Sequence, residues 1–318
     1  MRKFSFLALL LVASTLFAAY PDEYPAYLRL LGFSKGDIRD LQYGRFIMRT
    51  MKDRRPGESG VTAAKVFNVP GYFIRDYFSY IENFQNLNNF QAVGKFKPEP
   101  DLQDLGPLTF DAIDLQDLVA CKQNCALNLT DKEIAGIQKD SNPDELYRTI
   151  LLNRVQNYMQ RGNPSNSYLD AFPHLTAYFP RVVEYAATYP AKKDRRVPDY
   201  FYWVKEKIGK KNVIQVRHVF SQRIGDDFVI VNHLIYSNHS LMASASVFHL
   251  INYVDSGFPR TLLVYHGRTQ VDVEGGRPAR IDKKMFAAFQ KAGKKIEERY
   301  STQFYPGFPY ALPATDQR

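Results

Sequence analysis

Cysteine is scarce in this chain of 318 residues, and long apolar runs are scarcer still. After the first 20 residues, no segment has the roughly 20 consecutive apolar residues that a membrane-spanning helix needs. No internal repeat and no low-complexity tract is present. With 45% hydrophobic and 14% aromatic residues the composition excludes general disorder, and it suits one large globular domain or two smaller ones.

Motifs of covalent catalysis are also missing. The chain has no G-x-S-x-G nucleophile turn, no H-E-x-x-H zinc motif and no glycine-rich loop for phosphate. Neighbouring carboxylates such as Asp111 with Asp114 fit helix capping. We therefore predict no catalytic residue, no metal site and no cofactor, and we favour a binding protein over an enzyme.

The N-terminus has the pattern of a secretory signal peptide. Arg2 and Lys3 form a basic start, Phe4–Ala13 is a short apolar core, and small residues end at Ala18 and Ala19. We expect export to the periplasm or the extracellular space. The alternative is an uncleaved N-terminal anchor.

The two cysteines, Cys121 and Cys125, are expected to form a disulfide in an exported chain. The closed loop is short, so the stabilisation is modest, about 2 kcal/mol in the chain-entropy model. A metal site would need two more ligands, and the nearest histidine in sequence is His174. A redox-active pair favours C-x-x-C spacing instead.

The formal net charge is +9, which suits association with anionic lipid headgroups or cell-wall polymers. The densest basic stretches are Lys192–Arg196 and Lys205–Lys211. Solvated surface is the simpler interpretation of both stretches. Nucleic acid is not an expected partner, because export separates the protein from it.

One long amphipathic helix is predicted near the C-terminus, from about Arg280 to Tyr300. Apolar residues recur there every three or four positions, as on one stripe of a helix. The stripe consists of Ile281, Met285, Phe289, Ala292, Ile296 and Tyr300. Such a helix needs an apolar surface to lie on.

Strand candidates that precede this helix supply that surface. They are Val213–Phe220, Phe228–Tyr236, Leu241–Val254 and Thr261–Val273. The small residues of Ser240–Ser246 leave room for a ligand, a closely packed helix or a sharp bend. Strands followed by one long helix predict an α+β fold, with a curved antiparallel sheet around the C-terminal helix.

Helical signals dominate the middle of the chain, Lys97–Lys211. Thr130 and Glu133 form a capping-box pattern. Further helices are expected at Ala177–Thr188 and Tyr200–Ile208.

Before this middle, a strand, an aromatic helix and a strand follow one another at Val61–Val69, Tyr72–Phe84 and Phe90–Phe96. The stretch N-V-P-G-Y-F-I-R-D-Y-F resembles the opening of the START/Bet v 1-like, or helix-grip, superfamily. The resemblance covers roughly Gly44–Phe96 and Asn212–Tyr300. After the signal peptide expected over residues 1–19, it implies one such domain over 20–318, with a large helical insertion at about 97–211.

The chain also resembles a group of exported bacterial proteins without an established activity. The shared stretches are A-C-K-Q-N-C-A-L-N-L, Y-F-Y-W-V-K-E-K-I-G and H-L-I-Y-S-N-H-S. The superfamily resemblance implies a cavity between the sheet and the C-terminal helix, which usually holds a lipid, sterol, polyketide or other apolar molecule. We therefore expect an apolar small molecule or lipid as the partner.

Candidate ligand-binding residues lie on the predicted strands, at the end of one of them, and in the aromatic cluster before them. They are His218, Tyr236, His239, Tyr265, Arg268 and Trp203. The polar ones would hold the head of an otherwise apolar ligand, and the tryptophan would form a wall or lid. Ordinary strand packing and helix docking are the simpler explanations of each.

Two other functions stay open. A cyclase-like or hydrolase-like enzyme would need two of His218, His233, His239 and His266 to converge inside the cavity. A cell-envelope interaction module would instead have a sheet filled by side chains and an exposed apolar patch on the helical middle.

Overall fold

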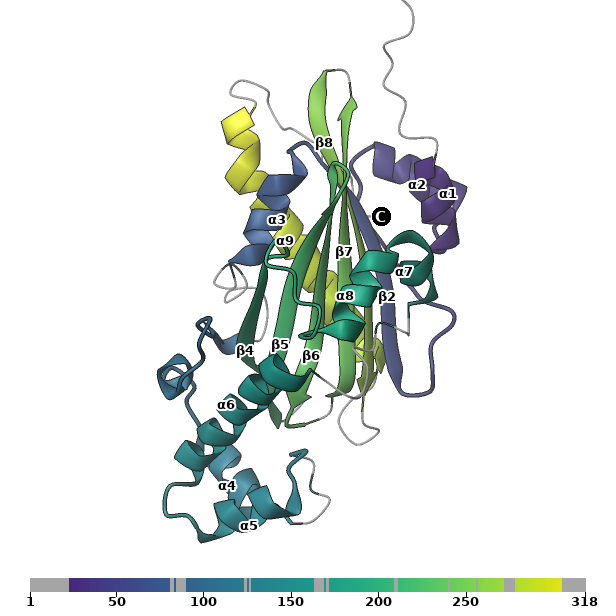
Figure 1. Ribbon diagram of the computed structural model, residues 1–318. Helices are drawn as coiled ribbons and strands as arrows, with labels where there is room; N and C mark the ends of the chain where they lie inside the picture. Colours follow the sequence, from purple (N-terminus) through teal and green to yellow (C-terminus); the bar gives the residue numbers. More distant parts are fainter. Residues whose placement is uncertain are drawn as a thin grey trace, which may run out of the picture.

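The structure, a computed structural model, has an α+β fold in which an eight-stranded antiparallel sheet curves around a C-terminal helix (Figure 1). It describes residues 23–80, 83, 90–122, 125, 127–162, 169, 172–208, 211–239, 241–255, 257–271 and 278–304. The predicted signal peptide and Ser240 lie outside these ranges. Within them, no helix is both long enough and apolar enough to span a bilayer.

The strand order of the sheet is β1-β2-β8-β7-β6-β5-β4-β3, and every neighbouring pair is antiparallel. The strands are β1 (Ile47–Thr50), β2 (Glu58–Phe67), β3 (Phe90–Lys95), β4 (Asp199–Ile208), β5 (Lys211–Ile224), β6 (Asp227–Ser237), β7 (Leu241–Asp255) and β8 (Phe258–Val271). Strands β5 to β8 confirm the four predicted ones. The pairing of β2 with β8 brings distant parts of the chain together, with Thr62 opposite His266.

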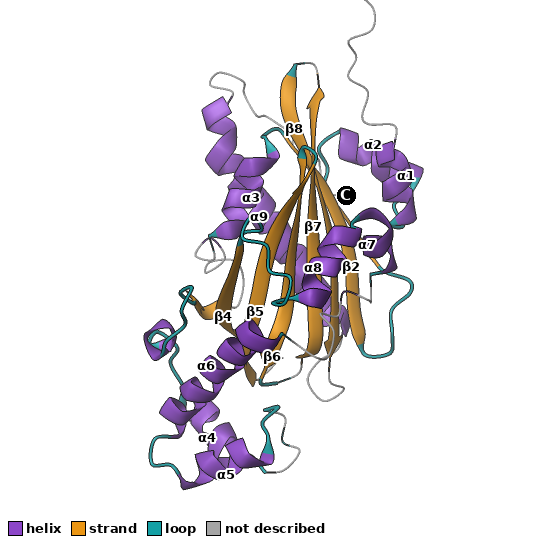
Figure 2. Cartoon of the chain, viewed as in Figure 1, coloured by secondary structure: helices purple, strands orange, loops and turns teal. Residues whose placement is uncertain are grey.

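One face of the sheet is covered by α9 (Pro278–Phe304) and α3 (Gly71–Ser79), as Figure 2 shows. Met285, Phe289, Ile296 and Tyr300 of the predicted apolar stripe pack on this face, and the Ile281 side chain lies outside the described part of the structure. The ring of Phe289 lies 4.1 Å from that of Tyr265, and Ile296 is fully buried. A sheet wrapped around one long helix is the helix-grip arrangement expected from the sequence.

The remaining helices of the described chain lie on the opposite side of the sheet, called the outer face below, where some of them extend past its lower end (Figure 1). These are α1 (Glu23–Leu30), α2 (Lys35–Gln42), the 3-10 helix η2 (Leu102–Leu105), α4 (Ala112–Ala120), α5 (Asp131–Lys139), α6 (Pro143–Arg161), α7 (Pro173–Tyr178) and α8 (Pro180–Thr188). The two N-terminal helices pack on β2 and β8, and the middle helices pack on β4 to β7. The sheet is therefore buried on both faces, which explains why its strands are apolar on both sides.

The helix predicted at Tyr200–Ile208 is wrong, because this segment is strand β4. Successive side chains alternate between the two covered faces. Phe201 and Trp203 pack among the outer helices, whereas Tyr202 and Val204 pack toward α9. A segment that is apolar on both faces shows no period that separates a strand from a helix. The helical middle therefore ends before this strand.

Two local predictions for the middle of the chain are confirmed. Cys121 and Cys125 form a disulfide. At the start of α5, the Thr130 N–H donates to Glu133 Oε2 over 2.7 Å and the Glu133 N–H donates to Thr130 Oγ1 over 3.3 Å. This reciprocal pair is the capping box expected from the sequence.

Candidate ligand-binding site

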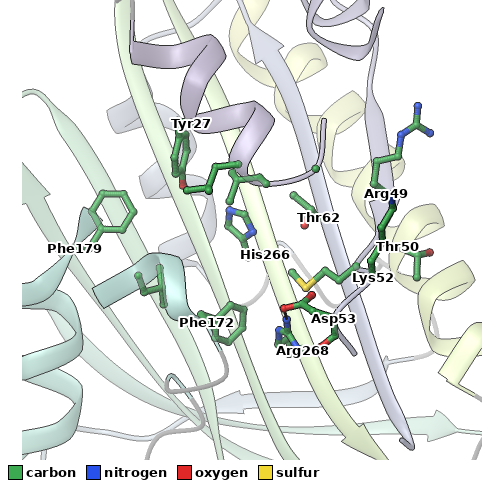
Figure 3. A pocket seen from close by; sticks show the side chains of 15 residues that line it. Tyr27, Arg49, Thr50, Lys52, Asp53, Thr62, Phe172, Phe179, His266 and Arg268 are labelled. Atoms are coloured by element: carbon green, nitrogen blue, oxygen red, sulfur yellow. Dashed lines mark hydrogen bonds and ion pairs between the residues drawn. The ribbon is translucent and has the colours of Figure 1, made fainter. Parts of the chain in front are cut away.

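A pocket of about 290 Å³ lies on the outer face, and Figure 3 shows its lining side chains. Its walls come from α1, from the end of β1, from the segment around α7, and from β2 and β8. The volume is at the small end of the range of roughly 300–1,000 Å³ that ligand sites occupy. We call this hollow the outer pocket.

The apolar wall of the outer pocket is mainly aromatic. Tyr27 of α1 contributes one ring of this wall. Phe172 and Phe179, which flank α7, contribute two more, and Leu175 of α7 adds an aliphatic side chain. All four side chains are otherwise buried in the protein core. Burial also raises the pKa of the Tyr27 phenol, which is therefore neutral at physiological pH.

Polar groups of the sheet complete the lining. His266 and Arg268 are two residues apart on β8 and so share a face of the strand. Thr62 lies opposite His266 on β2. The outer pocket thus combines an apolar wall with a few convergent polar groups, which is the usual composition of a small-molecule site.

Arg268 is the charged centre of this lining, and its side chain is only 5% exposed. Its Nη1 donates to Glu58 Oε2 over 2.9 Å, and its Nη2 donates to Asp53 Oδ2. The guanidinium carbon also lies 5.9 Å from the centre of the Phe172 ring, within reach of a cation–π contact. The Nε of Arg268 has no hydrogen-bond partner among the described residues.

Of the six predicted ligand-binding residues, Arg268 alone lines the outer pocket. Tyr265 is on the other face of the sheet, where it packs against Phe289 of α9. His239 lines a second hollow of only about 10 Å³ beside α4. The six residues therefore do not form one cluster.

The remaining three of the six are packed under the middle helices. The Tyr236 hydroxyl donates to the Leu127 carbonyl over 2.6 Å. The Trp203 indole N–H donates to the Asp104 carbonyl over 2.8 Å, and the whole residue is buried. His218 belongs to a buried network described next. Each of these contacts is of the kind that docks a helix on a sheet.

Two histidines do converge, as an enzyme would require. His218 and His233 are cross-strand neighbours on β5 and β6, with ring centres 5.0 Å apart. The Tyr158 hydroxyl lies 3.1 Å from His218 Nδ1 and 2.7 Å from His233 Nε2. Both imidazoles are completely buried, neither lines the outer pocket, and burial lowers the pKa of both. The arrangement is a neutral hydrogen-bonded network within the core.

Most of the outer pocket, including Tyr27, Asp53 and Phe172, was not predicted from the sequence, because these residues come from three distant segments. One usable signal is present on β8. His266 and Arg268 follow the apolar residues Leu262 and Val264 on one face of β8. Such a pair on a covered face needs polar partners or a ligand.

No protein-family model and no curated protein matches the chain. Among solved structures, a START superfamily protein from Mycobacterium smegmatis is similar, with 14% identity and a TM-score of 0.25. The match covers 31% of this chain and 66% of that protein, so the chain spans slightly less than two thirds of its length. Human STARD10 is similar with 12% identity and a TM-score of 0.33, over 86% of each chain. Likenesses of this strength carry no argument about function. The helix-grip assignment rests on the strand order and on α9.

Proposed function

We propose that this is an exported binding protein that holds a small apolar molecule in the outer pocket and does not transform it. The observation that carries the proposal is the aromatic wall formed by Tyr27, Phe172 and Phe179 around a polar patch on β8. Export is supported by the N-terminal sequence pattern and by the Cys121–Cys125 disulfide.

The size of the outer pocket limits the ligand. A volume of about 290 Å³ lies at the lower end of the range of small-molecule sites. This suits a single ring with a short tail or a short aliphatic chain. A lipid with two acyl chains is too large for this hollow.

We place the ligand on the outer face rather than between the sheet and α9, where the resemblance puts it. On the α9 side, the rings of Phe248, Tyr265 and Phe289 pack together, with centres 4.1–5.9 Å apart. The nearby guanidinium of Arg217 is hydrogen-bonded, since its Nε donates to Asn232 Oδ1 over 2.8 Å. These side chains serve as one another's partners, whereas those of the outer pocket border open space.

A binding role also agrees with the position of the histidine pair. General acid–base catalysis requires a group within hydrogen-bond reach of the substrate. His218 and His233 instead lie in the core, hydrogen-bonded to Tyr158.

Native mass spectrometry of the protein from its own host, with solvent extraction of the same sample, tests this proposal. We expect one compact apolar molecule per chain. Leu175→Trp enlarges a wall residue of the outer pocket and should remove the molecule. Tyr43→Trp, which adds an indole at a position 69% exposed, is the control and should retain it. A wild-type protein without ligand, or a ligand that Leu175→Trp retains in full, contradicts the proposal.

A further inference from the structure

One edge of the Arg268 guanidinium is only partly hydrogen-bonded. In an arginine, Nε–H and one N–H of Nη2 point the same way and form a fork that fits the two oxygens of a carboxylate. Here Nη2 donates to a single oxygen of Asp53, while Nε has no partner among the described residues. The side chain is 5% exposed and lines the outer pocket. One donor of a carboxylate-binding fork is therefore unpaired, although Nε itself is buried while Asp53 is in place.

The two carboxylates that contact Arg268 differ in how easily they can leave. The Glu58 side chain is 0% exposed, so its departure would strand a buried charge. The Asp53 side chain is 62% exposed, so water can solvate its carboxylate when it leaves the arginine. Asp53 also follows β1 directly, in the stretch that forms one rim of the outer pocket. It is thus the replaceable partner.

From this geometry we propose that the ligand is a small apolar acid, whose carboxylate displaces Asp53 and binds both Nε and Nη2 of Arg268. This inference rests on the proposed function and names its ligand class. A third anion beside Arg268, with Glu58 and Asp53 both in place, would be repelled, so binding and displacement go together. Lys52 also lines the outer pocket and adds positive charge near the displaced side chain.

The rest of the outer pocket suits the body of such an acid. Phe172 lies beside Arg268, and Tyr27 and Phe179 lie farther along the wall of the outer pocket, beyond His266 (Figure 3). Aromatic rings provide a large apolar contact area and favourable edge or stacked contacts with a ligand ring. Arg49, the other arginine of the lining, is already paired with Asp37. Arg268 is therefore the group that selects the acid.

Isothermal titration calorimetry of the full chain with 4-phenylbutanoate and with its alcohol, 4-phenylbutan-1-ol, tests the inference. The two compounds share one apolar body and differ in the charged head. We expect the acid to bind at least about tenfold more tightly than the alcohol, because only the acid forms the charge-assisted fork.

Substitution of Asp53 tests whether the ligand carboxylate displaces this side chain. Asp53→Asn removes the charged competitor, so the acid should bind about tenfold more tightly while the alcohol is unaffected. Asp226→Asn makes the same charge change at a turn residue whose side chain is 87% exposed, and should change neither affinity. An unchanged acid affinity in Asp53→Asn overturns the displacement.

Substitution of Arg268 provides the second arm. Arg268→Lys keeps the charge and loses the fork, so the acid should lose most of its advantage. The double variant Arg268→Gln with Glu58→Gln removes both buried charges together, which protects the fold, and should bind acid and alcohol equally. A double variant that keeps the preference for the acid contradicts the assignment to Arg268.

The failures of the two proposals can be told apart. If the alcohol binds as tightly as the acid, or if the molecule extracted from the host is neutral, the carboxylate inference is wrong, whereas the proposal of a small apolar ligand remains supported. If neither compound binds at millimolar concentration and no molecule is extracted, both fall. Extraction of an apolar acid that binds more weakly to Arg268→Lys supports both.

Discussion

Acidification will destabilise the protein through the buried histidine pair. Burial lowers the pKa of His218 and His233 in the folded protein. Tyr158 bonds to both rings, and Asp199 lies 3.4 Å from His218 Nε2, where it partly opposes the shift of that residue. Lys193, which pairs with Asp199 over 3.0 Å, lowers the pKa of His218 further. The folded state therefore holds both imidazoles neutral.

The direction and size of the effect follow from linkage. An unfolded chain protonates its histidines near pH 6.5, whereas the folded protein resists protonation. Stability is thus fully present above about pH 7 and is lost as the pH falls through about 6.5. Each histidine removes up to about 1.4 kcal/mol per pH unit. Between about pH 7.5 and about pH 5.5 we expect His233 to remove up to about 1.4 kcal/mol from the free energy of unfolding. His218 removes less because Asp199 limits its shift, so the pair removes at most about 2.7 kcal/mol.

Urea denaturation followed by the fluorescence of Trp203 measures this loss. Trp203 is the single tryptophan of the chain and is fully buried beside the middle helices. The double variant His218→Gln with His233→Gln should be less stable near neutral pH and nearly insensitive to acid in this window. The small slope that remains belongs to His239, whose pKa burial also lowers. A wild-type stability that does not change with pH, or a double variant with the full wild-type slope, would refute the reasoning.

Two single-contact predictions use the same denaturation assay. Tyr158→Phe should cost about 1–3 kcal/mol, because it leaves two buried imidazoles short of a partner. Tyr185→Phe should cost little, since that hydroxyl has no hydrogen-bond partner among the described residues. Gly94→Ala should cost about 1–3 kcal/mol, because its new Cβ would lie 2.6 Å from the Trp203 indole. In Gly293→Ala the nearest atom is 3.5 Å away, so the change should be neutral or stabilising. Equal losses within either matched pair would contradict these assignments.

The elements that sequence analysis predicted correctly have local causes. The period of apolar residues identifies α9, because a long helix repeats one pattern over many turns. Strands β5 to β8 follow one another in a meander, so each needs only its neighbours in sequence. The Thr130–Glu133 capping box is likewise contained in four residues.

The features that sequence analysis missed depend on what covers each face of the sheet. Strand β4 was predicted as a helix because both of its faces are apolar, and only the helices on either side explain that composition. The same cause separates Tyr265 from Arg268. Their odd spacing on β8 puts them on opposite faces, and the sequence does not say which face carries a pocket. Asp53 and Phe172 meet Arg268 only through the tertiary fold.

Amide hydrogen exchange, measured with and without the molecule extracted from the host, tests the central claim most directly. Bound ligand slows exchange where it contacts and orders the chain. We expect protection of residues 27–32, 50–53 and 172–179, the segments that form the outer pocket. Protection confined to α9 and β7, or no protection at all, would contradict a ligand site on the outer face.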